Sequence, residues 1–369
     1  MSIELENTKK FEDTDNVNDH INIYGDIDVK VSKLKSTEEN ELRLEIKGNN
    51  IDYSIINALR RTILMKIPIY AFHRSNIFIE TAKSRHMYNN DLLYNQFETL
   101  PIFDLSNEYD LENPELYLSN KVMKNIFGKF LPEKFIEEVD ENDNDDNNDD
   151  SNKKLLKVEM SMNVKNNTSS DIFASSHDAI LRVNGKIVDS YMKRKRICII
   201  ALKPSEEISL RAEANLGIAK IHAIYEATTN AIHDEITPTK FHLWYETLEQ
   251  LEKEVIFSKA CIILSKQLNN LKSYLTKNFS AERDPTEIVE IQLYGEDHTM
   301  GNILATILQK CEFVEKAGYC MPHALIDEIK LQYCLFPKTK KDPIKILIDC
   351  IKYLIKVFDK IGEQFNKIK

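Results

Sequence analysis

The sequence predicts an α+β fold in which two similar strand–helix units are joined in one chain, with a mostly β domain inserted into the first. Three patterns lead to this prediction. Short segments alternate apolar and charged residues, longer segments carry an apolar stripe at helical spacing, and a block near the N-terminus is echoed near the C-terminus. No apolar run is long enough to cross a bilayer, so we expect no membrane association.

The first unit opens on a strand in which Leu42, Leu44 and Ile46 alternate with charged residues. Asn50 follows as a suitable N-cap for a helix that Pro68 ends, because proline disfavours helix in the residue before it. A stripe with spacings of three and four marks the face of this helix that we expect to be buried; it contains Ile55, Ala58, Leu59 and Thr62.

The second unit repeats this order. A strand over 288–294 ends at Gly295, and an amphipathic helix follows. A last helix is predicted from about Pro343 to Lys360, and a long helix from Tyr245 to Lys277 is predicted to end the first unit. The apolar stripe of the amphipathic helix includes Met300, Ile303, Leu304 and Ile307.

The resulting division of the chain has four parts. We expect a disordered tail over 1–20, a first dimerisation domain over 21–80 plus 205–280, an inserted β-rich domain over 81–204, and a second dimerisation domain over 281–369. The insert contains an acidic run, expected to be a disordered loop over 138–153, because like charges repel and nothing in it can enter a core. Calcium binding is disfavoured there, since the run lacks the glycine and the closing glutamate of a helix–loop–helix calcium loop.

The echo between the two units is specific in its details. Leu42 to Gly48 leads into Ser54-Ile55-Ile56-Asn57-Ala58-Leu59, and Ile288 to Gly295 leads into Thr299-Met300-Gly301-Asn302-Ile303-Leu304. Each block is a strand, a glycine turn and a helix with one apolar face, which it cannot bury alone. We therefore expect the two stripes to face each other in an intramolecular pseudo-dimer, with the two long helices side by side.

These residues resemble a known family. Asn57-Ala58-Leu59-Arg60-Arg61 is similar to the signature helix of the third-largest subunit of eukaryotic RNA polymerase, the archaeal D subunit and the bacterial alpha subunit. Asn90 to Leu92 with Leu100-Pro101-Ile102 resembles the next block of that family, a short helix and a strand. Gly217 to Ala223 resembles its glycine-containing turn.

The end of the chain resembles the partner of that subunit, the eleventh eukaryotic or archaeal L subunit. Gly295 to Asn302 and Gly318 to Leu325 are close to its two hallmarks. The resemblance therefore implies a fusion of both partners, similar to fusions in large cytoplasmic DNA viruses. Ser54-Ile55-Ile56 departs from the more usual Thr-Leu-Gly, and the cysteines of the family's zinc or iron–sulfur insertion are absent.

The resemblance implies a non-catalytic assembly platform for a DNA-directed RNA polymerase. Its implied partners are the second-largest subunit, the largest subunit and small subunits of the tenth and twelfth types. Arg60 and Arg61 are the residues implied to contact the second-largest subunit, with a solvated basic edge as the alternative. A viral source implies an intracellular location, in the host cytoplasm or viral factory and in the virion.

Charge and cysteine usage fit protein partners better than nucleic acid or cofactors. Forty-nine basic against 59 acidic residues give a net charge of −10, so we expect no direct sequence-specific nucleic-acid binding. The basic run Lys193 to Arg196 is open to either reading, but it precedes an apolar strand and favours a solvated edge. The six cysteines form no close pair, so no metal or other cofactor is expected.

No catalytic residue is predicted. His298, His323 and His222 lack a nucleophile or second base at a suitable spacing, and there is no phosphate-binding glycine loop. The alternative to a polymerase subunit is an unrelated helical scaffold or virion protein with coiled-coil helices. That alternative requires sustained heptads from Tyr245 to Lys277, which Lys259 and Lys266 interrupt, and it leaves the echo unexplained.

Overall fold

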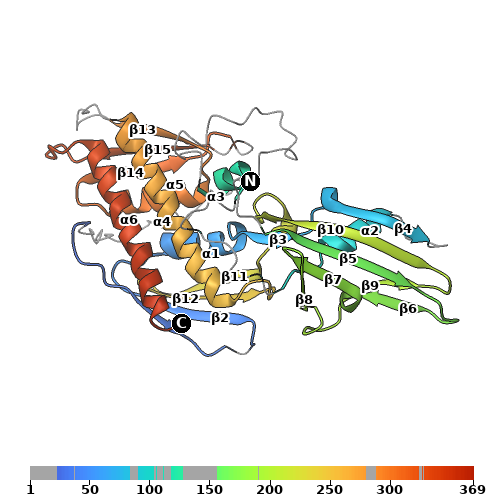
Figure 1. Cartoon of the computed structure of the whole chain (residues 1–369). Coiled ribbons are helices and arrows are strands. Elements are labelled where there is room, and N and C mark those ends of the chain that lie inside the picture. Colours follow the sequence, from blue (N-terminus) through green and yellow to red (C-terminus); the bar gives the residue numbers. More distant parts are fainter. Residues whose placement is uncertain are drawn as a thin grey trace, which may run out of the picture.

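The computed structural model describes residues 23–36, 38–83, 90–103, 105, 111, 118–127, 156–189, 191–279, 288–323, 326 and 328–369. Its fold is α+β, as predicted: a lobe rich in helices on one side and a lobe of strands on the other (Figure 1). The expected disordered tail over 1–20 and the expected acidic loop over 138–153 both lie entirely outside the described residues.

The first unit is a four-stranded antiparallel sheet, in the order β1-β2-β12-β11, covered by two helices. The inward residues of β2 are the predicted Leu42, Leu44 and Ile46, all of them buried. The elements of this unit are β1 (Lys30–Lys33), β2 (Glu41–Lys47), α1 (Tyr53–Met65), β11 (Thr228–Thr237), β12 (Lys240–Thr247) and α4 (Lys253–Asn278).

The second unit has the same order of strand, helix, hairpin and long helix. Its sheet order, β13-β15-β14, corresponds to β2-β12-β11 of the first unit, so the echo seen in the sequence extends to the strand pairing. The elements of this unit are β13 (Val289–Tyr294), α5 (His298–Lys310), β14 (Val314–Cys320), β15 (Glu328–Leu335) and α6 (Pro343–Asn366).

The insert is built on a six-stranded sheet and a separate strand pair, β6 with β9. In the sheet, β10 is the longest strand and pairs with β5 on one side and with β3 and β4 on the other. The elements of the insert are β3 (Ile69–Ala71), β4 (Ile77–Lys83), α2 (Asn90–Glu98), α3 (Asn120–Phe127), β5 (Val158–Lys165), β6 (Ile172–Ser175), β7 (Ala179–Val183), β8 (Lys186–Val188), β9 (Cys198–Leu202) and β10 (Glu207–Gly217). Short 3-10 helices cover Arg74–Asn76, Ser176–Asp178 and Ala223–Tyr225.

Strand pairing places the borders of the insert differently from the expected 81–204. β3 lies before residue 81, β4 spans it, and β10 lies after residue 204. All three strands nevertheless belong to the sheet of the insert. The cause is long-range: β10 is long enough for both β3 and β4 to pair along the same edge. We therefore propose that the insert begins near Ile69 and ends near Gly217.

Three local expectations also need correction. The N-cap of α1 is Asp52, whose carboxylate accepts hydrogen bonds from the backbone N–H groups of Ser54 and Ile55. Asn50 instead donates to the Tyr353 hydroxyl at 2.7 Å. Residues 245–252 are not helical, since Tyr245 lies in β12 and α4 starts at Lys253, and the expected strand at Leu100-Pro101-Ile102 is irregular chain.

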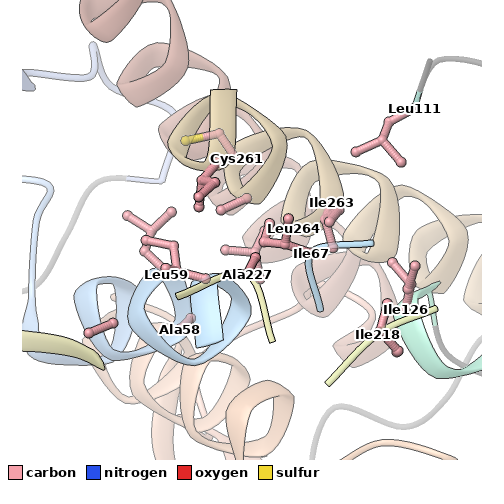
Figure 2. Close-up of a cluster of buried hydrophobic side chains, with 14 of the residues drawn as sticks. Ala58, Leu59, Ile67, Leu111, Ile126, Ile218, Ala227, Cys261, Ile263 and Leu264 are labelled. Atoms are coloured by element: carbon pink, nitrogen blue, oxygen red, sulfur yellow. The ribbon is translucent and has the colours of Figure 1, made fainter. Parts of the chain in front are cut away.

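The core of the helical lobe is centred on α4, which contacts α1, α3 and α6. Figure 2 shows Leu59 of α1 beside Cys261 and Leu264 of α4, and Ile126 of α3 near Ile218, the residue after β10. Within the described part of the chain, no helix combines the length and the apolar composition that crossing a bilayer requires.

Leu59→Asp should unfold the helical lobe, because Leu59 is fully buried and an unpaired buried carboxylate costs several kcal/mol, against a typical domain stability of about 5–15 kcal/mol. We expect the melting temperature, followed by circular dichroism, to fall by about 10 °C or more. Tyr53→Asp on the exposed face of the same helix is the control, with an expected change within about 0.5 kcal/mol. Equal melting temperatures for the two variants would contradict the placement of Leu59.

Candidate functional site: the interface between the two units

Two antiparallel helix pairs join the units. In one pair, the phenyl rings of Phe257 of α4 and Phe365 of α6 have centroids 4.6 Å apart, and Ser265 donates a hydrogen bond to Asp359 at 2.6 Å. As the numbering rises along α4 it falls along α6, so the two helices are antiparallel, and Figure 1 shows them side by side. The expectation that the two long helices lie together is therefore confirmed.

The shorter helices form the second pair, with α1 packed against α5. The end of α1 meets the start of α5 where Arg61 donates to the Thr299 hydroxyl at 2.6 Å. At the other end, Lys310 forms an ion pair with Asp52 at 2.8 Å. The residues expected at this interface are each at most 3% exposed: Ile55, Ala58, Leu59, Thr62, Met300, Ile303, Leu304 and Ile307.

The helix that carries the buried stripe of α1 packs against two other helices, α4 and α5. Leu59 points toward α4 of its own unit (Figure 2), and α1 also contacts α5. Direct contact between each residue of the two stripes therefore stays a prediction, although the two helices that carry them are packed together. Gly301 explains the close packing within the second unit, because a Cβ there would lie 2.4 Å from the Tyr319 ring of β14.

The N-caps of the two short helices bind across the interface. Asp52 caps α1 and pairs with Lys310 near the end of α5, while Asp297 caps α5 and lies 3.7 Å from the Arg61 guanidinium of α1. Each carboxylate sits at the positive end of its own helix dipole, which favours its charge. The two caps are thus also two reciprocal cross-unit ion pairs.

The two arginines expected to contact a partner subunit have different surroundings. Arg61 is engaged inside the chain through Thr299 and Asp297. Arg60 donates to the Asn57 side-chain oxygen at 2.9 and 3.1 Å. Burial and the neighbouring positive charge of Arg61 lower the pKa of Arg60.

A buried polar relay, which we did not predict, crosses the interface beside Arg61. The ammonium of Lys66, the C-cap of α1, donates to the Gln267 side-chain oxygen at 2.9 Å. The amide of Gln267 on α4 then donates to a Glu296 oxygen at 2.6 Å. All three residues are at most 5% exposed. The relay therefore connects both helices of the first unit to the segment just before α5.

The surroundings of the relay disfavour charge. Burial lowers the pKa of Lys66, with the negative charge of Glu296 acting against that effect. Burial also raises the pKa of Glu296 to about 7, although Lys66 and the hydrogen bond from Gln267 act in the other direction. The second oxygen of Glu296, Oε1, has no hydrogen-bond partner among the described residues.

The sequence offered little signal for this relay. Glu296 lies inside the segment Gly295 to Asn302, which resembles a hallmark of the eleventh subunit, but a glutamate before a helix N-cap is usually solvated. Lys66 and Gln267 are 201 positions apart, so no local pattern connects them. Only the lysine in an otherwise apolar stretch before Pro68 hinted at an unusual site.

The remaining candidates from the sequence have structural contacts. The His298 ring lies 3.3 Å from the Tyr319 hydroxyl, and His222 caps the short helix Ala223–Tyr225. In the basic run, Arg194 pairs with Glu249, and Arg196 donates to Ser175. Within the described ranges, no three His, Cys, Asp or Glu side chains cluster closely enough to hold a metal ion.

Fold and interface together define a class of protein: a chain in which two corresponding dimerisation units are already paired with each other. Profiles of the RNA polymerase Rpb3/Rpb11 dimerisation domain match it twice, over residues 45–268 and 288–364. The chain belongs to this family, and it is a polymerase subunit of the non-catalytic, dimerising type that contains both partners in one polypeptide.

Individual relatives agree with this assignment. A DNA-directed RNA polymerase subunit of Acanthamoeba polyphaga mimivirus is 53% identical over 349 residues, which cover 95% of this chain and 97% of that protein. The RPAC2 subunit of RNA polymerases I and III of Caenorhabditis briggsae is 39% identical over 90 residues, 24% of this chain and 55% of that protein. Subunit Rpo11 of Methanocaldococcus jannaschii is 31% identical over 88 residues, 22% of this chain and 89% of that protein.

Glu296→Gln should change how stability depends on pH. The pKa of Glu296 is raised from 4.5 to about 7 on folding, so its contribution is complete below pH 4.5 and is lost as the pH rises through 7. We expect wild type to lose about 3 kcal/mol relative to the variant between pH 4.5 and pH 8, measured by urea unfolding at several pH values. Glu252→Gln, at an exposed carboxyl, should follow wild type. Parallel curves for wild type and Glu296→Gln would contradict the buried placement of the carboxyl.

Proposed function

We propose that the chain is the assembly platform of a DNA-directed RNA polymerase, on which the second-largest subunit docks first. The observation that supports this most is that both dimerisation units are present and their shared interface is buried within one chain. Such a platform needs no other subunit to complete its core. It can therefore fold before the large subunits arrive and offer them a finished surface.

The docking surface that we propose is the outer face of α1 together with one neighbouring residue of β11. We call it the Arg60 patch, and it consists of Tyr53, Asn57 and Arg60 of α1 and His233 of β11. The Tyr53 side chain is half exposed, and its ring centroid lies 5.4 Å from that of His233 on β11. Burial and the charge of Arg60 lower the pKa of His233, so Arg60 is the cation of the patch. Arginine beside aromatic rings is the composition enriched at energetically important contacts.

We extend the proposal to the other partners and to location. The largest subunit and small subunits of the tenth and twelfth types would join through surfaces other than the Arg60 patch. The mimivirus relative, which this chain matches over nearly its whole length, supports a large DNA virus as source. We accordingly propose the host cytoplasm, at the viral factory, and the virion as its locations.

The helical scaffold alternative is not supported. It required a coiled coil over Tyr245 to Lys277, but Tyr245 lies in a strand, and the start of α4 packs within the globular core. The family assignment also accounts for both matched blocks, which the scaffold left unexplained.

Affinity purification of the tagged chain should recover the large polymerase subunits together with one copy of this chain per complex. Because both dimerisation units are supplied in one polypeptide, no separate small dimerisation partner should be present. Native mass spectrometry gives the stoichiometry directly. Two copies of the chain per polymerase, or a separate partner of the eleventh type, would rule out the proposed platform.

Arg60→Ala should weaken capture of the second-largest subunit by about tenfold or more, because truncation of an interface arginine of this kind often costs 2 kcal/mol or more. The melting temperature of the variant should stay near that of wild type, since the hydrogen bonds of Arg60 within the described part of the chain go to Asn57 of its own helix. Lys47→Ala, on β2 and paired with Glu45, is a matched control for loss of one surface cation. Equal capture by both variants would place the docking surface elsewhere.

A further inference from the structure

The two short helices correspond residue by residue. Their N-caps, Asp52 and Asp297, are 297 − 52 = 245 positions apart, and both helices have 13 residues. The same offset relates their C-caps, Lys66 and Cys311. It also relates Ile51 and Glu296, the residues directly before the N-caps, each 2% exposed. The short helices therefore give the interface two corresponding ends, whose cap residues can be compared position by position.

One end, which we call the polar end, consists of Lys66, Gln267 and Glu296. The C-cap of α1 and a residue of the long helix α4 come from the first unit, and the residue before the N-cap comes from the second. Hydrogen bonds of 2.9 and 2.6 Å connect the three side chains in series.

The corresponding apolar end consists of Cys311, Cys350 and Ile51. The C-cap of α5 and a residue of the long helix α6 come from the second unit, and the residue before the N-cap comes from the first. The Cys311 and Cys350 thiols are near neighbours, and both are fully buried. The neighbours of Ile51 locate it at this end, because Asn50 bonds to Tyr353 of α6 and Asp52 to Lys310 of α5.

We propose that the unlike composition of the polar and apolar ends makes each unit select the other as its partner and reject a second copy of itself. Unlike pairing puts Lys66 and Gln267 against Glu296, and the two thiols against Ile51, so both ends are matched. The residues that decide the choice of partner are thus Lys66, Gln267 and Glu296, with Ile51 as the position that excludes the wrong partner.

Pairing of like units would mismatch both ends. Two first units would bury Lys66 and Gln267 against Ile51 of the other copy, leaving the Gln267 amide N–H without its acceptor and the Lys66 ammonium without the nearby carboxyl of Glu296. Two second units would bury Glu296 against Cys311 and Cys350, leaving a carboxyl without its donor. Buried polar groups without partners are strongly unfavourable, so each like pair is penalised at both of its symmetry-related ends.

Such selection matters because the two units share their fold and the aspartate N-caps of their short helices. The covalent link raises the effective concentration of the unlike unit, but it does not prevent two chains from joining first unit to first unit and second to second. Specificity between similar partners commonly depends on an element that disfavours the wrong one, and a single buried polar residue can set such a choice.

The test uses the full chain, refolded from denaturant over a range of protein concentrations and analysed by sedimentation velocity. The triple variant Lys66→Met, Gln267→Leu, Glu296→Leu makes both ends apolar, so like pairing is no longer penalised. We expect its dimer fraction to exceed that of wild type by about tenfold or more, the effect of losing one buried polar mismatch. Two chains can also dimerise by exchanging units, so that the first unit of each chain pairs with the second unit of the other. Such dimers have the same polar end as the monomer, and the dimer fraction of wild type refolded in parallel measures how many of them form.

The matched control removes a different polar contact of the same interface. Ser265→Ala with Asp359→Ala eliminates the α4–α6 hydrogen bond but leaves both ends intact, so its dimer fraction should equal that of wild type. A triple variant that refolds with no more dimer than wild type would overturn the proposal. So would a triple variant that fails to refold, since the relay would then serve stability instead of the choice of partner.

A second variant tests the same idea by gain of pairing. Ile51→Glu supplies a carboxyl that can accept from the Gln267 amide of another copy when two first units pair, as Glu296 does in the unlike pair. We expect dimers from this variant, and we expect them to disappear when Gln267→Leu is added. Dimers that persist without Gln267, or an Ile51→Glu chain that yields none, would contradict the proposed role of the two ends.

Discussion

The architecture depends on one constraint: neither unit can bury its helices alone. The long helices α4 and α6 have buried residues on more than one side, and each needs the other to cover its apolar surface. The short helices α1 and α5 complete the same core, because they contact each other and each contacts the long helix of its own unit. An apolar surface of this kind left in water would favour association, which is why separate subunits with this fold would dimerise. In this chain the same association is intramolecular.

A polar relay in such a core is a cost unless its partners are present. Lys66, Gln267 and Glu296 satisfy one another in series, but Glu296 Oε1 has no partner among the described residues. Apolar side chains of similar size would often stabilise a core as well or better. Retention of a relay at only one of two corresponding ends therefore suggests a role in asymmetry, since it makes two similar units unlike at the contact that joins them.

Local patterns were sufficient to predict the elements but not the long-range relations. The alternation in β2 and the stripes of α1, α5 and α6 were identified because their periods reflect one buried face each. The start of α4 was misplaced because Leu248 and Leu251 continue a helical spacing, although Tyr245 to Thr247 pair in a strand with β2 and β11. Asn50 and Asp52 are both good N-caps in sequence. Their roles separate because the Asn50 side chain binds Tyr353, 303 positions away, and the backbone N–H of Asp28.

The candidate site shows the same division. The buried stripes were predicted, because apolar spacing reports burial directly. Arg60 and Arg61 were grouped as neighbours in a motif, whereas successive helix positions point about 100° apart and the two side chains reach different surroundings. The relay was missed, since burial of a lysine is decided by a glutamine and a glutamate more than 200 positions away.

The polar end is also where the insert joins the rest of the chain. The backbone N–H of Lys220, just after β10, donates to the Met65 carbonyl at the end of α1, adjacent to Lys66. β3 leaves the same helix end three residues after Lys66 and pairs with the last residues of β10. The insert is thus fixed to the helix end that carries the relay, by one strand entering and one leaving. A shift of α1 against α5 would move Lys66 relative to Glu296 and the root of the insert together. The attachment of the insert and the polar contact between the two units therefore lie at the same end of α1.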